Sequence, residues 1–279
     1  LECDLRDGIL LNAHKGELIP MKTDEEPVAQ MNDIKARRSD FTGSKISNSF
    51  IVQSDLSDTI MRRVKFIRAD LSNANLTGSN LEGADLSHAN LEGAVLHGAI
   101  LSQSTLNSTN LKSAEMVGAI LDEVDLSLAT NLESAHFARR LNELEGDFRA
   151  KVDSHIAWIK SSGKEGERLD LSKVDLTGQD LSKLNLSGAV FRFAVMRNVK
   201  LGGCSLVMSD LAFADLRGAD LTGADLRGIS LSRATATGAS FTGSDITPVP
   251  VEGSTVGFWP AQLDRARFDN CNFQGTQMQ

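Results

Sequence analysis

ADLRGADLTGADLRG, residues 214–228, is almost the same five-residue word written three times. In every copy Ala, Asp and Leu stand at the first, second and third positions, the fourth position varies, and Gly stands at the fifth. A helix brings residues three or four apart to one face, and a strand brings residues two apart to one face. Neither period brings both a small and a large apolar residue of every five-residue unit to the inside. The word therefore predicts a backbone that is neither an ordinary helix nor an ordinary strand.

The five-residue word continues in two long runs. The third position is apolar in eighteen consecutive units between residues 41 and 126, and in eighteen more between 171 and 256, where only Ala236 is small. In the first run the first position holds only small or β-branched residues. After Pro248 and Pro250 the phase shifts, and the last three units are centred on Leu263, Phe268 and Phe273.

One position restricted to small side chains and one restricted to large ones imply two inward sites in each unit. A coil with four flat sides of five residues provides them, one at the middle of a side and one near a crowded corner. A circuit then takes twenty residues, and successive circuits stack about 4.8 Å apart. Backbone N–H and C=O groups pair between circuits, because buried polar groups need partners. We therefore predict an all-β solenoid.

The word resembles the A(D/N)LXX repeat of the pentapeptide-repeat family, and the resemblance covers residues 41–130 and 167–275. It implies a right-handed quadrilateral β-helix in two runs. The family includes DNA-mimicking proteins that protect DNA gyrase, effectors and many members of unknown role. Most members are thought to be non-catalytic, so the resemblance also implies a protein that is not an enzyme.

The limits of the repeats divide the chain into five segments. The sequence before residue 41 is charged and contains two prolines after two further units centred on Leu5 and Leu10, and the central interruption lacks the word. The predicted segments are an N-terminal cap or partial repeats with a loop at 1–40, repeat run 1 at 41–130, a helical insert with α-helix at 131–166, repeat run 2 at 167–257, and C-terminal repeats with a cap at 258–279.

Within the insert, residues 134–160 have apolar side chains at three- and four-residue steps, which predicts a helix with one apolar face. Ser134 is a suitable N-cap, Gly163 a suitable stop, and Gly146 a break between two helices. Two interpretations stay open: a helix that covers the open end of a coil, or a helix that binds a partner. The apolar stripe consists of Phe137, Leu141, Leu144, Phe148, Val152, Ile156 and Ile159.

Composition limits the function classes. The net charge of −8 argues against nucleic acid or an anionic membrane as the partner. No apolar run is long enough for a membrane span, and no phosphate-binding or hydrolase motif is present. The five His are dispersed, so we expect no metal site, and because catalytic motifs are also missing we expect no cofactor and no catalysis. The first residue is Leu, which leaves an upstream segment open, and we expect a cytoplasmic protein.

The three cysteines, Cys3, Cys204 and Cys271, all stand at the first position of a unit, where Ala or Ser is usual. We expect them to be buried and unreactive. Their odd number and wide spacing predict neither a disulfide framework nor a zinc site.

Apolar residues at outward positions are the candidate contact sites. An exposed cluster of this kind marks a contact surface, which would bind either the helical insert or a partner protein. Phe258 and Trp259, in the irregular stretch 247–262, would cap the coil or contact a partner. The main candidate patch is Val190, Phe193, Val207, Met208 and Phe213, and a second patch is Ile60, Ile100 and Ile120 in one column.

These observations predict a non-catalytic scaffold that binds a protein partner of unknown identity. The alternative is a DNA-mimicking modulator of a DNA-binding enzyme such as DNA gyrase, which needs continuous anionic stripes. If a circuit takes twenty residues, each acidic column is interrupted, as in Asp180, Lys200, Asp220 and Ser240. Residues 169–257 carry nine acids and eight bases, so the run is nearly neutral. The sequence therefore favours the scaffold.

Overall fold

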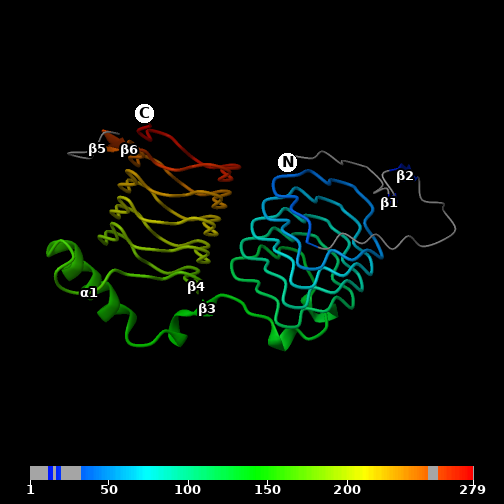
Figure 1. Ribbon diagram of the computed structural model, residues 1–279. Coiled ribbons are helices and arrows are strands. Elements are labelled where there is room, and N and C mark those ends of the chain that lie inside the picture. The colour runs from blue at the N-terminus through cyan, green and yellow to red at the C-terminus, as the bar shows by residue number, and fades with distance from the viewer. Residues whose placement is uncertain (1–11, 15–16, 20–32, 251–256, 279) are drawn as a thin grey trace. The chain divides into compact units, whose positions relative to one another are not determined.

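The computed structural model describes residues 12–14, 17–19, 33–250 and 257–278, and the units predicted around Leu5 and Leu10 lie outside them (Figure 1). The chain divides into two compact units, Leu1–Phe137 (unit 1) and Ala138–Gln279 (unit 2). In the first unit, strand β1 (Asn12–His14) pairs with β2 (Glu17–Ile19) in an antiparallel hairpin. The rest of each unit consists mainly of a coil.

Each coil has four sides and twenty residues per circuit, as the sequence predicts. The second position of a unit forms a parallel bridge with the second position twenty residues later, for example Asp70 with Asn90 and Asn90 with Asn110. Four such columns run along each coil. The bridges are isolated, because each side is only a few residues long before the chain turns.

A left-handed residue at the fifth position makes each turn. The N–H of Ala219 donates to the carbonyl of Leu216 at 3.0 Å across the corner between two sides. Gly218, inside that turn, has a φ of +67°, a conformation that glycine adopts without steric cost. Other residues occupy the same position elsewhere, including Phe193 at +58° and Met208 at +54°. The five-residue period therefore reflects one left-handed turn in every unit.

The interior of each coil is filled by the first and third positions. In the word at 214–228, Leu216, Leu221 and Leu226 have no exposed surface, and the alanines before them are 1% exposed. Burying one leucine stabilises the fold by about 1.5–3 kcal/mol. Because a residue of this kind recurs in every unit, each coil has a continuous apolar core and no lumen.

Departures from the twenty-residue register mark insertions. In unit 1, Glu115 pairs with His136, one residue later than expected, after the 3₁₀ turns η1 (Leu126–Leu128) and η2 (Leu132–Ser134). In unit 2, Ser230 pairs with Gln262, twelve residues later than expected. The extra residues include β5 (Val249–Pro250) and β6 (Phe258–Trp259), which pair as an antiparallel hairpin, so the phase shift after Pro248 is confirmed.

The predicted helix over 134–160 is wrong in its first half. Helix α1 spans Phe148–Lys160, and its N-cap is Asp147, whose carboxylate accepts a hydrogen bond from the N–H of Ala150 at 3.2 Å. Ser134 instead ends η2, and the next residues form β3 (Arg139–Arg140) and η3 (Leu141–Glu143). Gly146 has a φ of +80°, which a continuous helix does not allow. The helix therefore begins only after the left-handed Gly146, where Asp147 caps its first turn.

The insert covers the base of unit 2, which is its first circuit, residues 170–189. Strand β3 pairs in parallel with β4 (Val174–Asp175), and Val152 of α1 is part of the apolar core. Leu141, Leu144, Phe148 and Ile156 pack against that core while remaining partly exposed. These contacts support the interpretation of the insert as a cap.

His155 is the ionisable residue of this cap. Its side chain is fully buried, its Nδ1 accepts a hydrogen bond from the N–H of Leu169 at 3.1 Å, and its ring stacks on Trp158 at 5.6 Å. Burial lowers the pKa of His155, and the charge of Arg168 lowers it further. A neutral imidazole is therefore part of the contact between α1 and the coil.

Two adjacent glycines test the turn. Gly203 has a φ of +65°, and Gly202 does not have a positive φ, while a Cβ at either would make only ordinary contacts. Gly203→Ala should lower the free energy of unfolding by about 1–2 kcal/mol, because only this change forces an L-residue into the left-handed region. Gly202→Ala should change it by less than about 1 kcal/mol. Urea denaturation of both variants measures the difference, and equal losses would contradict the assigned turn.

The low pKa of His155 predicts that unit 2 loses stability in mild acid. The unfolded chain binds a proton near the ordinary pKa of 6.5, whereas the folded chain resists it. The free energy of unfolding should be highest above that pH and fall between about pH 7 and 5, by at most about 1.4 kcal/mol per pH unit. His155→Gln keeps an acceptor for Leu169 and removes the titration. A pH slope that is the same in both proteins would refute the prediction.

Candidate interaction surfaces

The predicted main patch is distributed over one side and two corners of unit 2. Val190 is the second residue of its unit, and Asp210 is the residue that follows it in the same column. Phe193 and Phe213 lie on the corner after that side, and Val207 and Met208 on the corner before it. Between the two corners Arg192 forms an ion pair with Asp210 at 3.0 Å. The candidate residues therefore belong to two surfaces, which we call the Phe193 corner and the Met208 corner.

The Phe193 corner is an aromatic stack held between guanidinium groups. The rings of Phe193 and Phe213 stack with centroids 4.6 Å apart and an interplanar angle of 21°. Arg233 lies 5.0 Å from the centroid of Phe213, and Arg192 lies 5.8 Å from that of Phe193. Such ring pairs contribute about 0.5–1.5 kcal/mol, and cation–π contacts about 0.5–1 kcal/mol. Phe213 is only 8% exposed, so much of this cluster stabilises unit 2 itself.

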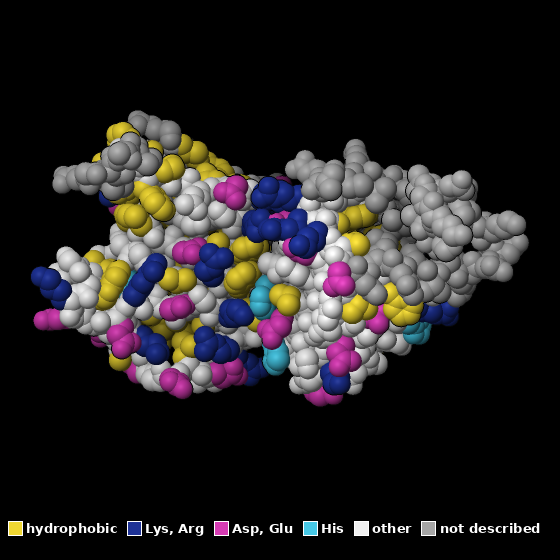
Figure 2. Space-filling model, in the orientation of Figure 1, with side chains coloured by type: hydrophobic (Ala, Val, Ile, Leu, Met, Phe, Trp, Pro, Cys, Tyr) yellow, Lys and Arg dark blue, Asp and Glu magenta, His cyan; other side chains and the backbone are white. Residues whose placement is uncertain are grey.

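The Met208 corner is more open. A Cβ added at Gly228 would lie 3.0 Å from Trp259 Cδ1 and Val249 Cγ2 and 3.3 Å from Met208 Cγ, so these three side chains converge there. Met208 is 43% exposed, Trp259 44% and Phe258 61%. Figure 2 shows hydrophobic side chains gathered over the β5–β6 hairpin, at the upper left. The Met208 corner consists of Val207 and Met208 on the coil, together with Val249 and Trp259 of the hairpin.

The two tryptophans of the chain contact the same corner column. Gly188, Met208 and Gly228 are the fifth positions of three successive circuits. The ring of Trp158, from α1, lies 3.5 Å from a Cβ added at Gly188, and Trp259 lies against Gly228. Met208 therefore stands between two sites where an aromatic ring packs on a glycine of the coil.

The second predicted patch is also divided. Ile60 pairs with Asn80, Asn80 with Ile100, and Ile100 with Ile120, so the predicted column exists but contains an amide. Ile60 is 44% exposed, whereas Ile100 and Ile120 are buried. Phe50, at a second position on another side of unit 1, is 41% exposed, and sequence reasoning missed it. Its signal was a large apolar residue where Asp or Asn is usual.

The three aspartates of the word at 214–228 have different environments. Asp215 is 2% exposed and pairs with Arg197 at 2.6 Å and Arg217 at 2.8 Å. Burial raises the pKa of Asp215, but the two guanidinium groups outweigh it and the net shift is downward. Asp225 is partly exposed and pairs with Arg227, whereas Asp220 is exposed. A DNA mimic needs rows of unpaired carboxylates, so these pairs do not favour that alternative.

The cysteines are poor nucleophiles. The thiol of Cys204 is buried and donates to the carbonyl of Leu181 at 2.7 Å, and burial raises its pKa to about 11. Cys271 is half-buried, donates to Ala236, and also has a raised pKa because of burial. Cys3 lies outside the described residues. At neutral pH both described thiols are protonated.

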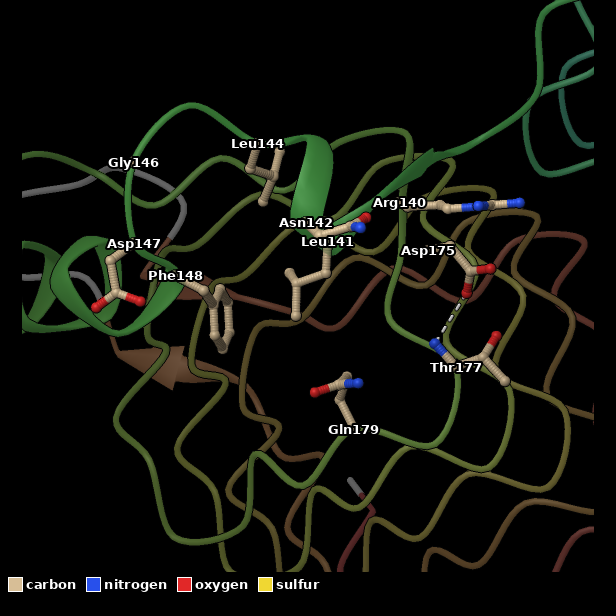
Figure 3. A pocket seen from close by; sticks show the side chains of 10 residues that line it. All are labelled: Arg140, Leu141, Asn142, Leu144, Gly146, Asp147, Phe148, Asp175, Thr177 and Gln179. Atoms are coloured by element: carbon tan, nitrogen blue, oxygen red, sulfur yellow. Dashed lines mark hydrogen bonds between the residues drawn. The ribbon is translucent and has the colours of Figure 1, made fainter.

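A groove of about 520 Å³ lies at the base of unit 2 (Figure 3). Leu141 and Phe148 point into it from the insert, toward Gln179 on the coil, while Arg140 points away. In the described part of the chain, no group of three His, Cys, Asp or Glu side chains could hold a metal ion. The single α-helix described there is also too short to cross a membrane.

Several solved structures are similar to this chain, and two of the three that follow, HetL and Rfr23, are described as pentapeptide repeat proteins. HetL, involved in heterocyst differentiation regulation in the cyanobacterium Nostoc sp. strain PCC 7120, is 25% identical over 89% of this chain and 88% of its own, with a TM-score of 0.37. QnrB1, a plasmid-mediated fluoroquinolone resistance protein, is 16% identical over 87% and 92%, with a TM-score of 0.30. Rfr23 from the cyanobacterium Cyanothece 51142 is 24% identical over 39% and 88%, with a TM-score of 0.22. No functionally curated protein matches this sequence.

Residues 65–103, 89–127, 170–206 and 209–247 match the pattern described as pentapeptide repeats, in eight copies. These ranges lie within the two coils, whose twenty-residue register and left-handed fifth positions follow from that repeat. The chain belongs to the pentapeptide-repeat family.

Proposed function

We propose that this chain is a non-catalytic scaffold that binds a protein partner. The observation that carries the proposal is the Met208 corner, where the side chains of Met208, Val249 and Trp259 converge at Gly228 while Met208 is 43% and Trp259 44% exposed. Single exposed apolar residues are ordinary on a protein surface, but a cluster built from two chain segments marks a contact site.

The backbone at Met208 strengthens this inference. Met208 has a φ of +54°, in the left-handed region, which Gly and Asn adopt more easily than a residue with a long side chain. The conformation costs about 1–2 kcal/mol for an L-residue. Methionine adapts its shape to many apolar surfaces, which suits a binding role. Met208 therefore stabilises the turn no better than Asn would, whereas its side chain gives a partner an apolar contact.

A protein partner suits the chemistry of this corner better than a charged ligand. The nearest cation on the column is Arg227, which pairs with Asp225 at 2.7 Å and lies 3.7 Å from Asp245. Interface cores are enriched in aromatic residues and methionine and depleted in charge. The filled interior of the coil also leaves little room for a buried catalytic pocket, which supports a role without catalysis.

Replacing Met208 and Trp259 should abolish partner binding without unfolding the protein. In Met208→Asn/Trp259→Ser, the amide fits the left-handed turn and the apolar contact is lost. We expect at least a tenfold loss of affinity for the partner and a protein that still unfolds in one cooperative transition. Affinity purification with quantitative mass spectrometry finds the partner, and calorimetry with that purified protein measures the loss.

His88→Asn is the matched control, because His88 has a φ of +59° on a corner of unit 1. It should bind the partner as the unmodified protein does. If the double variant recovers the same proteins with the same affinity, the Met208 corner is not the binding site. Inhibition of gyrase supercoiling that is equal in the double variant and the unmodified protein would instead favour the DNA-mimic alternative.

A further inference from the structure

The base of unit 2 has a neighbouring strand on one of its four sides, where β3 pairs with β4, and its third side has none among the described residues. Higher in the coil, the N–H at each second position donates to a carbonyl of the circuit below. On the third side, the N–H of Lys200 donates to Gln179 at 2.9 Å, and that of Asp220 donates to Val199 at 3.0 Å. The first circuit has no circuit below it, so its equivalent groups depend on the insert for partners.

The insert contributes a strand to the second side of the base and single side-chain contacts near two of its corners. Strand β3 pairs with β4 on the second side, and the N–H of Arg139 donates to the carbonyl of Lys173 at 2.9 Å. His155 accepts from Leu169 before the first side, and Arg168 donates to Gly188 after the fourth. An extended segment therefore already docks on this edge by parallel backbone pairing, on one side only.

The third side, Gln179–Ser182, presents a row of unpaired backbone groups. Among the hydrogen bonds of the described residues, none involves the N–H of Asp180 or the carbonyls of Thr177, Asp180 and Ser182. One circuit higher the equivalent carbonyls of Arg197, Lys200 and Gly202 all accept hydrogen bonds, at 2.8, 2.9 and 3.0 Å. The spacing of donor and acceptors at the base is thus that of a parallel edge, and such an edge is a template for another strand.

An apolar groove adjoins this edge. Its volume is about 520 Å³, and its lining includes Leu141, Leu144 and Phe148 on the insert and Thr177 and Gln179 on the coil. Figure 3 shows Leu141 and Phe148 directed toward Gln179. A strand paired with residues 179–182 would place alternate side chains toward this groove. An apolar side chain fits its lining.

The rim of the groove has a net negative charge. The side chain of Asp180 is 61% exposed and lies 3.7 Å from Lys200. Opposite charges across an interface favour association and select the partner. The acids that line the groove are Asp147 and Asp175, and the only base among its lining residues is Arg140, whose side chain points away from it.

We propose that the third side of this base binds an extended segment of a partner protein, with an apolar residue flanked by basic ones. The segment adds a parallel strand to Gln179–Ser182 and places its apolar side chain beside Leu141 and Phe148. Main-chain hydrogen bonds give affinity in this mode, and the groove gives specificity. The inference rests on the proposed scaffold function, to which it adds a second site and the chemistry of its ligand.

Asp180→Pro tests the proposal, because proline removes the N–H that points away from the coil. That N–H has no partner within the described structure, and proline tolerates an extended edge position. Proline also removes the carboxylate that accepts from the N–H of Ser182 at 3.1 Å, so the equilibrium constant for folding should fall by no more than about fivefold. Asp180→Asn is the matched control, since it keeps the N–H and removes only the charge. Asp220→Pro, which loses the bond to Val199, should be destabilised and so verifies the assigned hydrogen bonds.

The probe is a displayed library of random dodecapeptides, selected on the full chain. We expect a pool enriched in Lys and Arg around an apolar residue, whose members bind Asp180→Pro at least tenfold more weakly and bind Asp180→Asn less than threefold more weakly. Hydrogen exchange at the Asp180 amide should slow in the complex. The proposal is overturned if no pool is enriched, or if every selected peptide binds Asp180→Pro unchanged. Neither result affects the proposed scaffold function, because that proposal is tested separately with the Met208→Asn/Trp259→Ser variant.

Discussion

Hydrogen bonding between successive circuits is the constraint on which this structure depends. Each unit donates the N–H groups of its third and fifth positions to the next circuit, as Leu221 and Gly223 do to Ser240 and Thr242. It donates the N–H of its second position to the previous circuit, as Asp220 does to Val199. Since buried backbone groups must be paired, a shift of one residue would break a whole row of bonds. The register is therefore held by the backbone, and the side chains are chosen to fit it.

That constraint explains how much could be predicted from the sequence. The column Asp180, Lys200, Asp220 and Ser240 was predicted from arithmetic alone, and the bridges confirm it. The start of α1 was not predicted, because Leu141 and Leu144 keep a helical spacing although they belong to a 3₁₀ turn and the residue after it. An irregular segment that packs on a core and a helix with one apolar face can both have apolar residues three or four apart. The spacing alone could therefore not distinguish the two structures. The cap at Asp147, directly after the left-handed Gly146, was the signal that decided the boundary.

The exposure of a side chain at an outward position was harder to predict than the direction in which it points. Phe213 and Met208 both stand at the left-handed fifth position of a unit, yet Phe213 is buried and Met208 is not. The position in the unit tells which way a side chain points, but it does not tell what lies above it. Phe213 has Phe193 and Arg233 as neighbours in its column, whereas Met208 has glycines twenty residues before and after it. A partner for an outward residue therefore has to be sought in its column and in the insertions that reach that column.

A coil of identical circuits has no natural end, so the segments outside the repeat determine what its ends can do. In unit 2 the insert contributes β3 and α1 to the base: β3 pairs with β4, and α1 buries Val152 and His155 against the coil. The hairpin β5–β6 interrupts the coil before its last circuit and brings Trp259 onto Gly228. Uniform repeats present the same small and polar side chains along every column, which gives a partner little to distinguish. Recognition in such a fold thus depends on the places where the repeat is broken, because only there do apolar side chains and unpaired backbone groups reach the surface together.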